Sequence, residues 1–423
     1  MSKEEVDLLI ENASEVITLR GGSQKPLLGK QMENLGITRD GSVAVNEGKI
    51  VLVGKTSELK RKFEGEETID ASEKVVMPGF VDPHTHLVFA GSREDEFEMR
   101  IQGSMYLKIL EEGGGILKTV RETRKASGDE LTEHCRETLD VMLEHGTTTV
   151  EAKSGYGLTT KEEIKCLEVL KTLNKEHPID IVPTFLGAHA VPSEYKDDTD
   201  EYIHLLVNEM IPAVASRKLA EFCDVFCEKG VFNLTQSKTI LQAGKQQGLT
   251  PKIHADEMTK LGGAELAAEL EAVSASHLLF ASNRGLKALA KHGVIAVLLP
   301  GASFSLMTGR YADARKMIQW SVPIALGTDY NPSCWTESQQ TIIALACRQM
   351  KMAPAETIMA TTINAAHTLN RARVVGSLET GKKADVAILN VPNHRFLGYR
   401  FGTNLVDKVI KNGKLVVNNG KMT

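Results

Sequence analysis

One pattern repeats from about residue 77 to residue 370: a short β-branched or apolar run stands before an amphipathic helical stretch. This is the pattern of βα units in a parallel sheet. Eight units predict an α/β fold of the (β/α)₈ TIM-barrel type, in which functional side chains gather where the carboxyl ends of the strands meet. The predicted strands are residues 75–81, 147–152, 180–186, 222–227, 251–254, 275–279, 294–299 and 323–327.

Capping signals mark where two of the predicted helices begin. Ser127 stands three residues before Glu130, and Thr160 stands three residues before Glu163, which is the spacing of a capping box. The first of these helices carries an apolar face and ends near Gly146. We expect that face to pack on the sheet.

The two ends of the chain differ from its middle, because they read as short strands and turns. Segments 41–45 and 48–54 have this character at one end, and segments 384–389 and 409–417 have it at the other. Neither terminal segment holds enough apolar residues to form a stable hydrophobic core alone. We therefore expect residues 1–76 and 373–423 to form one composite β-sandwich domain beside a catalytic barrel of residues 77–372.

Composition excludes some classes of partner. The 423 residues carry a formal net charge of −5, and their Lys, Arg, Asp and Glu are mixed, so we expect no nucleic-acid partner. The amino terminus lacks the pattern of a secretory signal. The least polar segment, residues 293–309, is short for a membrane span and contains Pro300, so we expect no membrane association and a cytoplasmic location.

The six cysteines are scattered without paired spacing, which predicts reduced thiols. Cys223 and Cys227 could suggest a metal site. Their neighbours are apolar, however, so we interpret them as part of a buried strand, where a free cysteine behaves as a small hydrophobic residue.

Polar residues follow or close several of the predicted strands. His84 and His86 follow the first strand, and the alternation of an extended chain points both rings to the same side. An isolated His-x-His is a weak signal. His254 closes the fifth strand, His277 the sixth and Asp329 the eighth, and a barrel brings all of these ends to one mouth.

Three imidazoles and a carboxylate suit Zn²⁺ or Fe²⁺ rather than Mg²⁺ or Ca²⁺. We predict one zinc or iron ion per chain, held by His84, His86, His254 and Asp329, with His277 holding the water or a substrate carbonyl. Such an ion lowers the pKa of a bound water to about 7 and supplies hydroxide, so the expected chemistry is hydrolysis. Asp329 would take the proton of the nucleophile and deliver it to the leaving nitrogen.

Residues 78–86, Pro-Gly-Phe-Val-Asp-Pro-His-Thr-His, followed by the distant His, His and Asp, resemble the amidohydrolase superfamily. Within it, segments 84–93, 113–116, 151–158 and 254–257 resemble the imidazolonepropionase family, and the likeness covers nearly the whole chain. The resemblance implies hydrolysis of a small-molecule substrate, 4-imidazolone-5-propanoate, to N-formimino-L-glutamate in histidine degradation. We also expect a homodimer.

The resemblance implies roles for residues outside the metal set. Arg93 would receive the substrate carboxylate through two parallel hydrogen bonds, and Tyr156 would add a hydroxyl to the same pocket. His189, at the end of the third strand, would approach the ring. Glu257, three residues after His254, would bind the substrate and handle a ring-nitrogen proton.

The loop after Asp329 departs from the family pattern. The family commonly has Asn-Pro-Gly and then a small hydroxylated residue, whereas this chain has Asn331, Pro332, Ser333 and Cys334, followed by Trp335. We still expect Asn331, Ser333 and Cys334 to contact the substrate, and Trp335 to narrow the pocket. Cys334 is not expected to be a nucleophile, since a metal site supplies one.

Three alternatives stay open. An aminohydrolase acting on a cytosine-, guanine- or adenosine-like ring would use the same metal arrangement, but a neutral base does not explain Arg93 and Tyr156. A binuclear centre with a carboxylated lysine is disfavoured, because no lysine closes the fourth strand and Lys153 lies after the second. A non-catalytic scaffold is disfavoured by the presence of every ligand position.

Overall fold

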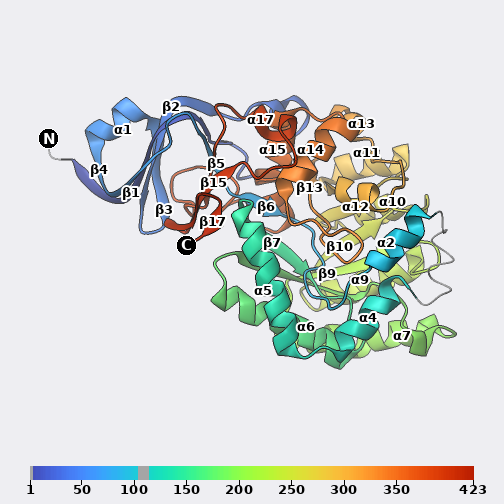
Figure 1. The fold of residues 1–423 in the computed structure, drawn as a ribbon. Helices are drawn as coiled ribbons and strands as arrows, with labels where there is room; N and C mark the ends of the chain where they lie inside the picture. Colours follow the sequence, from blue (N-terminus) through green and yellow to red (C-terminus); the bar gives the residue numbers. More distant parts are fainter. Residues whose placement is uncertain (1–2, 103–113) are drawn as a thin grey trace.

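A parallel eight-stranded barrel and a separate nine-stranded sheet lie side by side in this chain (Figure 1). The computed structural model describes residues 3–102 and 114–423, so Gly113, at the start of the segment 113–116, lies outside the described residues. The blue amino-terminal strands and the red carboxyl-terminal strands share the separate sheet in Figure 1. The predicted fold class, a TIM barrel with a domain made from both chain ends, is confirmed.

All pairings along the barrel are parallel, and the strands follow one another in chain order from β13 back to β6. The eight strands are β6 (Phe80–Asp82), β7 (Thr147–Lys153), β8 (Asp180–Ala188), β9 (Phe222–Cys227), β10 (Thr250–Ala255), β11 (Ser274–His277), β12 (Ile295–Leu298) and β13 (Ile324–Leu326).

The first and last barrel strands meet through a short seam beyond their carboxyl ends. Thr85 and Tyr330 form a parallel bridge. The backbone N–H of Asp329 donates to the carbonyl of His84 at 3.0 Å, and the N–H of His86 donates to the carbonyl of Tyr330 at 2.8 Å. The closure of the barrel therefore sets two histidines beside one aspartate.

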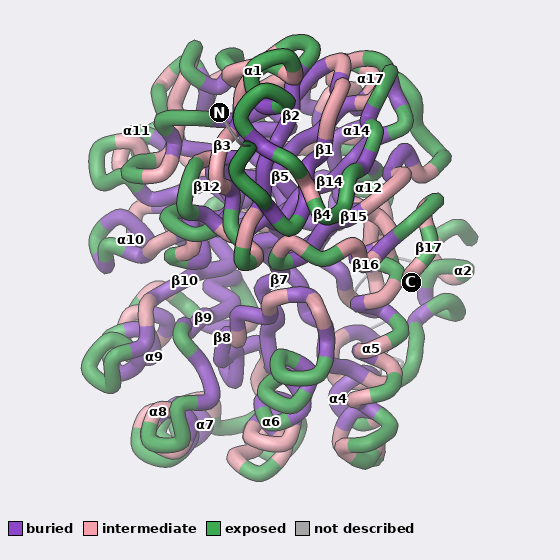
Figure 2. The backbone as a smooth tube through the Cα atoms, turned by 90° about the vertical axis from the view of Figure 1, so that its left-hand side faces the viewer, coloured by how far each residue is buried: buried purple, intermediate pink, exposed green. Residues whose placement is uncertain are grey.

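Helices surround the barrel, and their outer turns are exposed while the strands are buried (Figure 2). The α-helices among the described residues, including α1, which packs on the terminal sheet, and α17, which packs on α14, are α1 (Thr56–Lys62), α2 (Glu94–Ile101), α4 (Ile116–Lys125), α5 (Gly128–Glu144), α6 (Thr160–Glu176), α7 (Thr199–Leu205), α8 (Ile211–Ser216), α9 (Leu234–Gln246), α10 (Gly263–Glu269), α11 (Asn283–His292), α12 (Pro300–Ser305), α13 (Ala314–Gln319), α14 (Gln339–Gln349), α15 (Pro354–Ala360), α16 (Ile363–Thr368) and α17 (Phe396–Tyr399). Among the described residues, no helix combines the length and the apolar character needed to cross a membrane.

One of the two predicted capping boxes is confirmed and the other is wrong. The hydroxyl of Ser127 accepts the N–H of Glu130 at 3.2 Å, and the carboxylate of Glu130 accepts the N–H of Ser127 at 2.8 Å. Helix α6 is capped by Thr159, whose hydroxyl accepts the N–H of Glu162. Thr160 is already the first helical residue, because the preceding threonine has the extended backbone that a cap requires.

The terminal sheet is organised around β1, which bends in its middle. The first half of β1 pairs with β4 and its second half with β5, and the pairing with β2 shifts register between Ile10 and Ala13. This bend lets the sheet curl around a core of its own. The strands are β1 (Glu4–Ile17), β2 (Ile37–Asn46), β3 (Lys49–Lys55), β4 (Phe63–Asp70), β5 (Val75–Pro78), β14 (Val386–Leu389), β15 (Val406–Lys411), β16 (Lys414–Asn418) and β17 (Lys421–Met422).

The predicted first barrel strand, residues 75–81, is in fact two strands of different sheets. Strand β5 pairs with β1 and β14 of the terminal sheet, whereas β6 pairs with β7 of the barrel. Gly79 separates them, and a Cβ atom there would lie 2.4 Å from the side chain of Thr148. The run is uniformly apolar because both halves are buried, so its composition hides the break. The division of domains at residues 76/77 and 372/373 stays a prediction.

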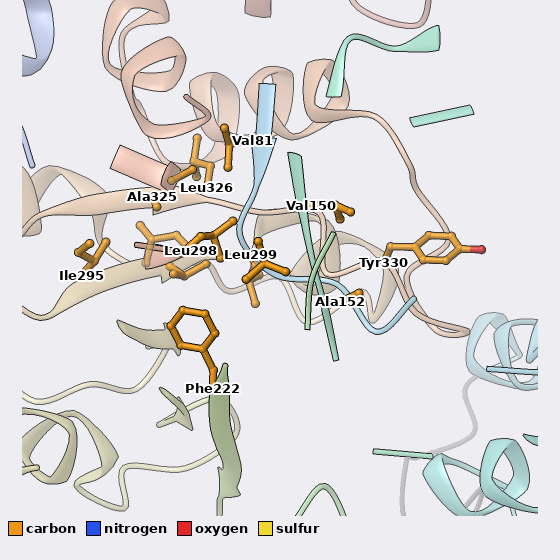
Figure 3. Close-up of a cluster of buried hydrophobic side chains, with 14 of the residues drawn as sticks. Val81, Val150, Ala152, Phe222, Ile295, Leu298, Leu299, Ala325, Leu326 and Tyr330 are labelled. Atoms are coloured by element: carbon orange, nitrogen blue, oxygen red, sulfur yellow. The ribbon is translucent and has the colours of Figure 1, made fainter. Parts of the chain in front are cut away.

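Apolar side chains from several strands form the core of the barrel domain (Figure 3). Val81 of β6, Val150 of β7, Phe222 of β9, Leu298 of β12 and Leu326 of β13 are all fully buried or nearly so. On β7, Val150 and Ala152 alternate with the charged residues Glu151 and Lys153, because successive side chains point to opposite faces. The opposite face of these strands is therefore free to carry polar groups.

Candidate active site

Five polar side chains converge at the carboxyl ends of the barrel strands. His84 and His86 follow β6, His254 lies near the end of β10, His277 ends β11, and Asp329 follows β13. None of them is more than 4% exposed. The mouth of the barrel thus brings together residues as far apart in the chain as His84 and Asp329, which are 245 positions apart.

The atoms that could bind a metal ion lie close to one another. Nε2 of His84 and Nε2 of His86 each lie 3.4 Å from Oδ1 of Asp329. Nε2 of His254 lies 3.4 Å from Nε2 of His86. His84, His86 and Asp329 form one group whose ligand atoms all lie within 4.8 Å, and His84, His254 and His277 form a second.

The chemistry of these atoms fits a divalent ion. Nε2 of His84 and Oδ1 of Asp329 are buried, and neither has a hydrogen-bond partner among the residues that the structure describes. Leaving such groups unpaired is unfavourable, so their convergence is better explained by a bound cation than by packing. The mixture of imidazole and carboxylate suits zinc or iron. Because His277 belongs to the second group, its place inside or outside the ligand set stays a prediction.

Burial lowers the pKa of His84, His86 and His277 and keeps these three imidazoles neutral. It holds the pKa of His84 and that of His86 well below the ordinary value, and it lowers the pKa of His277 to about 3. A neutral imidazole has a free lone pair, which is the form that binds a metal ion. Burial also raises the pKa of the Asp329 carboxyl.

The backbone around the metal group is strained and well anchored. Asp329 has a φ of +54° and His277 a φ of +71°, in the left-handed region that non-glycine residues rarely adopt. The carboxylate of Asp82 accepts the N–H of Thr328 at 3.1 Å and its hydroxyl at 2.6 Å. It also accepts the N–H of His84 at 3.4 Å. One buried carboxylate therefore ties both sides of the seam.

A cavity of about 430 Å³ opens beside the metal group, a size suited to a small ligand. Met258, Ala302 and Leu306 contribute apolar atoms to its wall. All seven residues predicted to bind substrate line it. They are Arg93, Tyr156, His189, Glu257, Asn331, Ser333 and Cys334.

Arg93, Tyr156 and His189 lie together on one wall of the cavity. The guanidinium of Arg93 is hydrogen-bonded to the hydroxyl of Tyr156, and both side chains are buried. Nδ1 of His189 lies 3.0 Å from the carbonyl oxygen of Gly155, so it is placed to donate to that oxygen. The ring of His189 stacks on that of His86 at 4.7 Å. This wall combines a fixed cation with two aromatic hydrogen-bonding groups.

The loop that carries Tyr156 is held by Glu163, a residue that sequence reasoning assigned only to a cap. Its carboxylate accepts the N–H groups of Gly155 at 3.2 Å, Gly157 at 2.8 Å and Leu158 at 2.8 Å. Gly155 has a φ of +114°, which a residue with a side chain would rarely adopt. The signal was present in the sequence, since Glu163 shares the apolar face of its helix.

Glu257 lies two residues beyond β10 and faces His277. Its Oε1 atom lies 3.6 Å from Nδ1 of His277. Burial and the nearby charge of Asp329 raise the pKa of Glu257 to about 8. The carboxyl group can therefore hold a proton at neutral pH.

The loop after Asp329 is stabilised by its own amide side chain. Nδ2 of Asn331 donates to the carbonyl of Asp329 at 2.7 Å. Oδ1 of Asn331 accepts the N–H groups of Ser333 at 2.8 Å and Cys334 at 3.2 Å. The Cys334 thiol donates to the carbonyl of Thr328, and burial raises its pKa, so it is no thiolate nucleophile.

Trp335 does not narrow the cavity, so that expectation is wrong. It is absent from the cavity lining and is 48% exposed. Its ring packs at 5.3 Å from Phe89, 5.7 Å from His134 and 5.7 Å from Tyr330. The short turn at Asn331 directs the indole to this outer aromatic group instead.

The interior of the barrel below the mouth holds charged residues that the sequence analysis did not place. Glu151, Lys153, Asp224 and Lys252 are at most 2% exposed. Lys153 was expected only after the second strand, but it ends β7 and donates to Asp224 at 2.8 Å. The clearest available signal was Asp224, the one charged residue of the otherwise apolar strand β9.

All six cysteines are free, and five of them are buried. Cys223 and Cys227 lie in β9 with every residue of the strand buried. Their interpretation as residues of a buried strand is confirmed.

The chain is similar to known proteins over its whole length. The model of the amidohydrolase family matches residues 75–416. An imidazolonepropionase from Alkaliphilus metalliredigens (strain QYMF) is 54% identical over 420 residues, covering 99% of each chain. An imidazolonepropionase from Geobacillus kaustophilus (strain HTA426) is also 54% identical, covering 98% of this chain and 99% of the other.

Solved structures with the same fold are more distant in sequence. An adenosine deaminase from Xanthomonas campestris with bound zinc has a TM-score of 0.75 at 20% identity, covering 100% of this chain and 95% of that one. A 5-methylcytosine deaminase from Klebsiella pneumoniae has a TM-score of 0.74 at 16% identity, covering 97% and 98%. At these identities the likeness is one of fold alone.

Proposed function

The chain belongs to the amidohydrolase family and, within it, to the imidazolonepropionase family, and on that premise we propose that it hydrolyses 4-imidazolone-5-propanoate to N-formimino-L-glutamate. The protein is a hydrolase acting on a C–N bond of a cyclic amide, and the reaction belongs to histidine degradation.

One observation carries the proposal: the group of metal-binding atoms borders a cavity whose wall holds a buried arginine. Oδ1 of Asp329 lies 3.4 Å from two imidazole nitrogens, and the same cavity is lined by Arg93 and Tyr156. Hydrolysis of a cyclic amide needs the first feature. Recognition of a propanoate arm explains the second.

The residues at the mouth support the following chemistry. A divalent ion, when bound, lowers the pKa of a water to about 7 and polarises a carbonyl group. His84, His86, His254 and Asp329 would hold that ion, and Asp329 would accept the proton of the attacking water. His277, neutral because burial lowers its pKa to about 3, can donate a hydrogen bond to the substrate carbonyl oxygen.

Glu257 is suited to the proton transfer at the ring nitrogen. With a pKa of about 8 it carries a proton at neutral pH and can exchange a proton with a ring nitrogen, while Asp329 would pass the proton of the water to the leaving nitrogen as the C–N bond breaks. Arg93 would bind the propanoate carboxylate, with the Tyr156 hydroxyl beside it. His189 would contact the ring, and the loop of Asn331, Ser333 and Cys334 would close the opposite side.

An aminohydrolase acting on a neutral base is the alternative, and Arg93 argues against it. A buried guanidinium facing a cavity is costly unless an anion satisfies it, and a cytosine- or guanine-like ring offers none. The deciding experiment offers freshly generated imidazolone propanoate to the purified protein and follows the loss of its ultraviolet absorbance. Cytosine and guanine are the controls, and turnover of either without turnover of the imidazolone would overturn the proposal.

Metal analysis sharpens the same proposal. One zinc or iron ion per chain is expected, and a protein that binds neither would favour a non-catalytic scaffold. The cytoplasmic location and the homodimer stay predictions, which cell fractionation and sedimentation analysis would check.

A further inference from the structure

Four charged side chains fill the middle of the barrel below the metal group. We call Glu151, Lys153, Asp224 and Lys252 the barrel-core ion network; their side chains are at most 2% exposed. They come from β7, β9 and β10, and all point to the inside of the barrel, because they contact one another across it.

Each member of the barrel-core ion network has a charged partner. Nζ of Lys153 donates to Oε1 of Glu151 at 2.7 Å and to Oδ2 of Asp224 at 2.8 Å. Nζ of Lys252 donates to the same Oε1 of Glu151 at 2.9 Å, and Thr184 donates to it at 2.6 Å. Two ammonium groups thus balance two carboxylates.

The network ends on a residue of the metal group. Asp224 divides its two oxygens: Oδ2 accepts from Lys153, while Oδ1 lies 3.2 Å from Nδ1 of His254. The other nitrogen of the same ring, Nε2, faces the metal group and lies 3.4 Å from Nε2 of His86. His254 therefore stands between the network and the mouth.

Stability alone does not explain such a network. Removing charges from water is unfavourable, and well-packed apolar residues in place of a buried ion group are often neutral or stabilising. Strands β12 and β13 consist only of apolar residues, so apolar side chains also face the interior of this barrel. Because burying these charges is unfavourable, we expect the network to have a role beyond stability, namely to position a neighbouring side chain.

The contact with Asp224 determines which tautomer of the His254 imidazole is favoured. If Nδ1 carried the lone pair, that lone pair would face the carboxylate oxygen of Asp224 at 3.2 Å, and the two would repel. With the proton on Nδ1, the contact is a charge-assisted hydrogen bond, and the lone pair stands on Nε2, toward the metal group.

We propose that Asp224, oriented by Lys153, is a positioning residue that fixes the tautomer and direction of the His254 imidazole for metal binding. The inference rests on the proposed metal-dependent function. Glu151 and Lys252 complete it by keeping Lys153 in place and the interior electrically balanced.

A matched pair of variants tests the proposal. Asp224→Asn removes the charge next to His254, and Asp385→Asn removes a charge from an equally buried aspartate, which Lys411 contacts at 2.7 Å in the terminal domain. Zinc affinity is measured for each by competition with a chelator of known affinity, and the melting temperature of each metal-free protein is measured alongside.

Asp224→Asn should weaken zinc binding about 10- to 100-fold, the usual effect of losing a partner of a metal-binding histidine. Asp385→Asn should lower the melting temperature but leave zinc affinity within about twofold of the wild type. Equal losses of affinity, or none in Asp224→Asn, would overturn the inference. A wild type that bound neither zinc nor iron would overturn the proposed function. A wild type that binds zinc, with the same affinity in Asp224→Asn, would overturn the inference alone.

A second measurement needs no variant at the network. In ¹⁵N-labelled metal-free wild-type protein, NMR of the imidazole nitrogens reports the tautomer of His254, assigned by the loss of its signals in His254→Gln. Protonation at Nδ1 supports the proposal. Protonation at Nε2 overturns it, even if Asp224→Asn fails to fold.

Discussion

Two regions of the molecule bury lysines against carboxylates, and they differ in which group each network of ion pairs contacts last. The barrel-core ion network ends on His254 at the mouth of the barrel. The other group, the junction ion network of Asp180, Lys383, Asp385 and Lys411, joins the amino end of β8 to the terminal sheet. Within it, Nζ of Lys411 lies 2.8 Å from Asp180 and 2.7 Å from Asp385.

The difference follows the polarity of the barrel. In this fold the carboxyl ends of the strands carry the chemistry, while the amino ends serve stability. The carboxylate of Asp180, at the amino end, is one-third exposed and accepts from Lys383 and Lys411, whereas that of Asp224 is fully buried and contacts an imidazole. The same pairs of ions thus link two domains at one end and orient a metal-binding residue at the other.

Removing the metal ion should have the largest effect. Chelation is expected to abolish turnover of the imidazolone, because the water is then no longer activated, and added zinc or iron should restore it. The melting temperature should fall as well, since a bound ion stabilises only the folded state. Turnover that survives chelation, with metal analysis showing none bound, would remove the mouth from the catalytic role assigned to it.

Glu257→Gln should have the second-largest effect on turnover. Losing a proton-transfer group at the mouth is expected to lower kcat about 10²- to 10⁴-fold, with the substrate KM changed far less. Steady-state kinetics measures both. A kcat close to that of the wild type would exclude Glu257 from proton transfer.

The same variant tests the raised pKa of Glu257. In the metal-free protein the folded state keeps a proton at this carboxyl up to about pH 8, whereas the unfolded chain releases it near the ordinary value of 4.5. Between these values the folded state binds more protons, so rising pH weakens the wild type. Melting temperatures across this window should therefore decline more steeply for the wild type than for Glu257→Gln, and parallel curves would contradict the assignment.

Arg93→Ala should act on binding rather than on turnover. Loss of a buried charge-assisted pair with the substrate carboxylate is expected to cost about 2 kcal/mol, or roughly a 30-fold lower kcat/KM, mainly through KM. Arg61→Ala, which alters an exposed arginine on α1 beside the terminal sheet, is the control. An unchanged KM in Arg93→Ala would remove this residue from substrate recognition.

Lys411→Met should have the smallest effect on activity and sharpens the contrast between the two networks. It leaves Asp385 buried without its lysine, so the melting temperature should fall by several degrees. The kcat and KM of the metal-loaded enzyme should stay within about twofold of the wild type, because the junction lies at the other end of the barrel. A large loss of kcat would show that the junction and the mouth are coupled.

Much of the fold and of the site could be predicted from local patterns. The alternation of apolar runs and amphipathic stretches predicted the barrel, and the residues at the strand ends predicted the composition of the mouth. His84, His86, His254 and Asp329 do lie together, and their roles as metal ligands stay predictions. The predicted cap at Thr160 was wrong by one residue. Thr159 and Thr160 have the same side chain, and only the backbone conformation distinguishes the capping residue.

The sequence by itself determined which residues stand at the carboxyl end of each strand, because the side-chain period of a strand and its place along the chain are local properties. Only the tertiary structure decided that residues 75–81 divide between two sheets at Gly79, and that Lys153 lies between Glu151 and Asp224. Both depend on which distant strands become neighbours. A charged residue in an apolar run shows that a partner must exist, but its identity is settled only when the barrel closes.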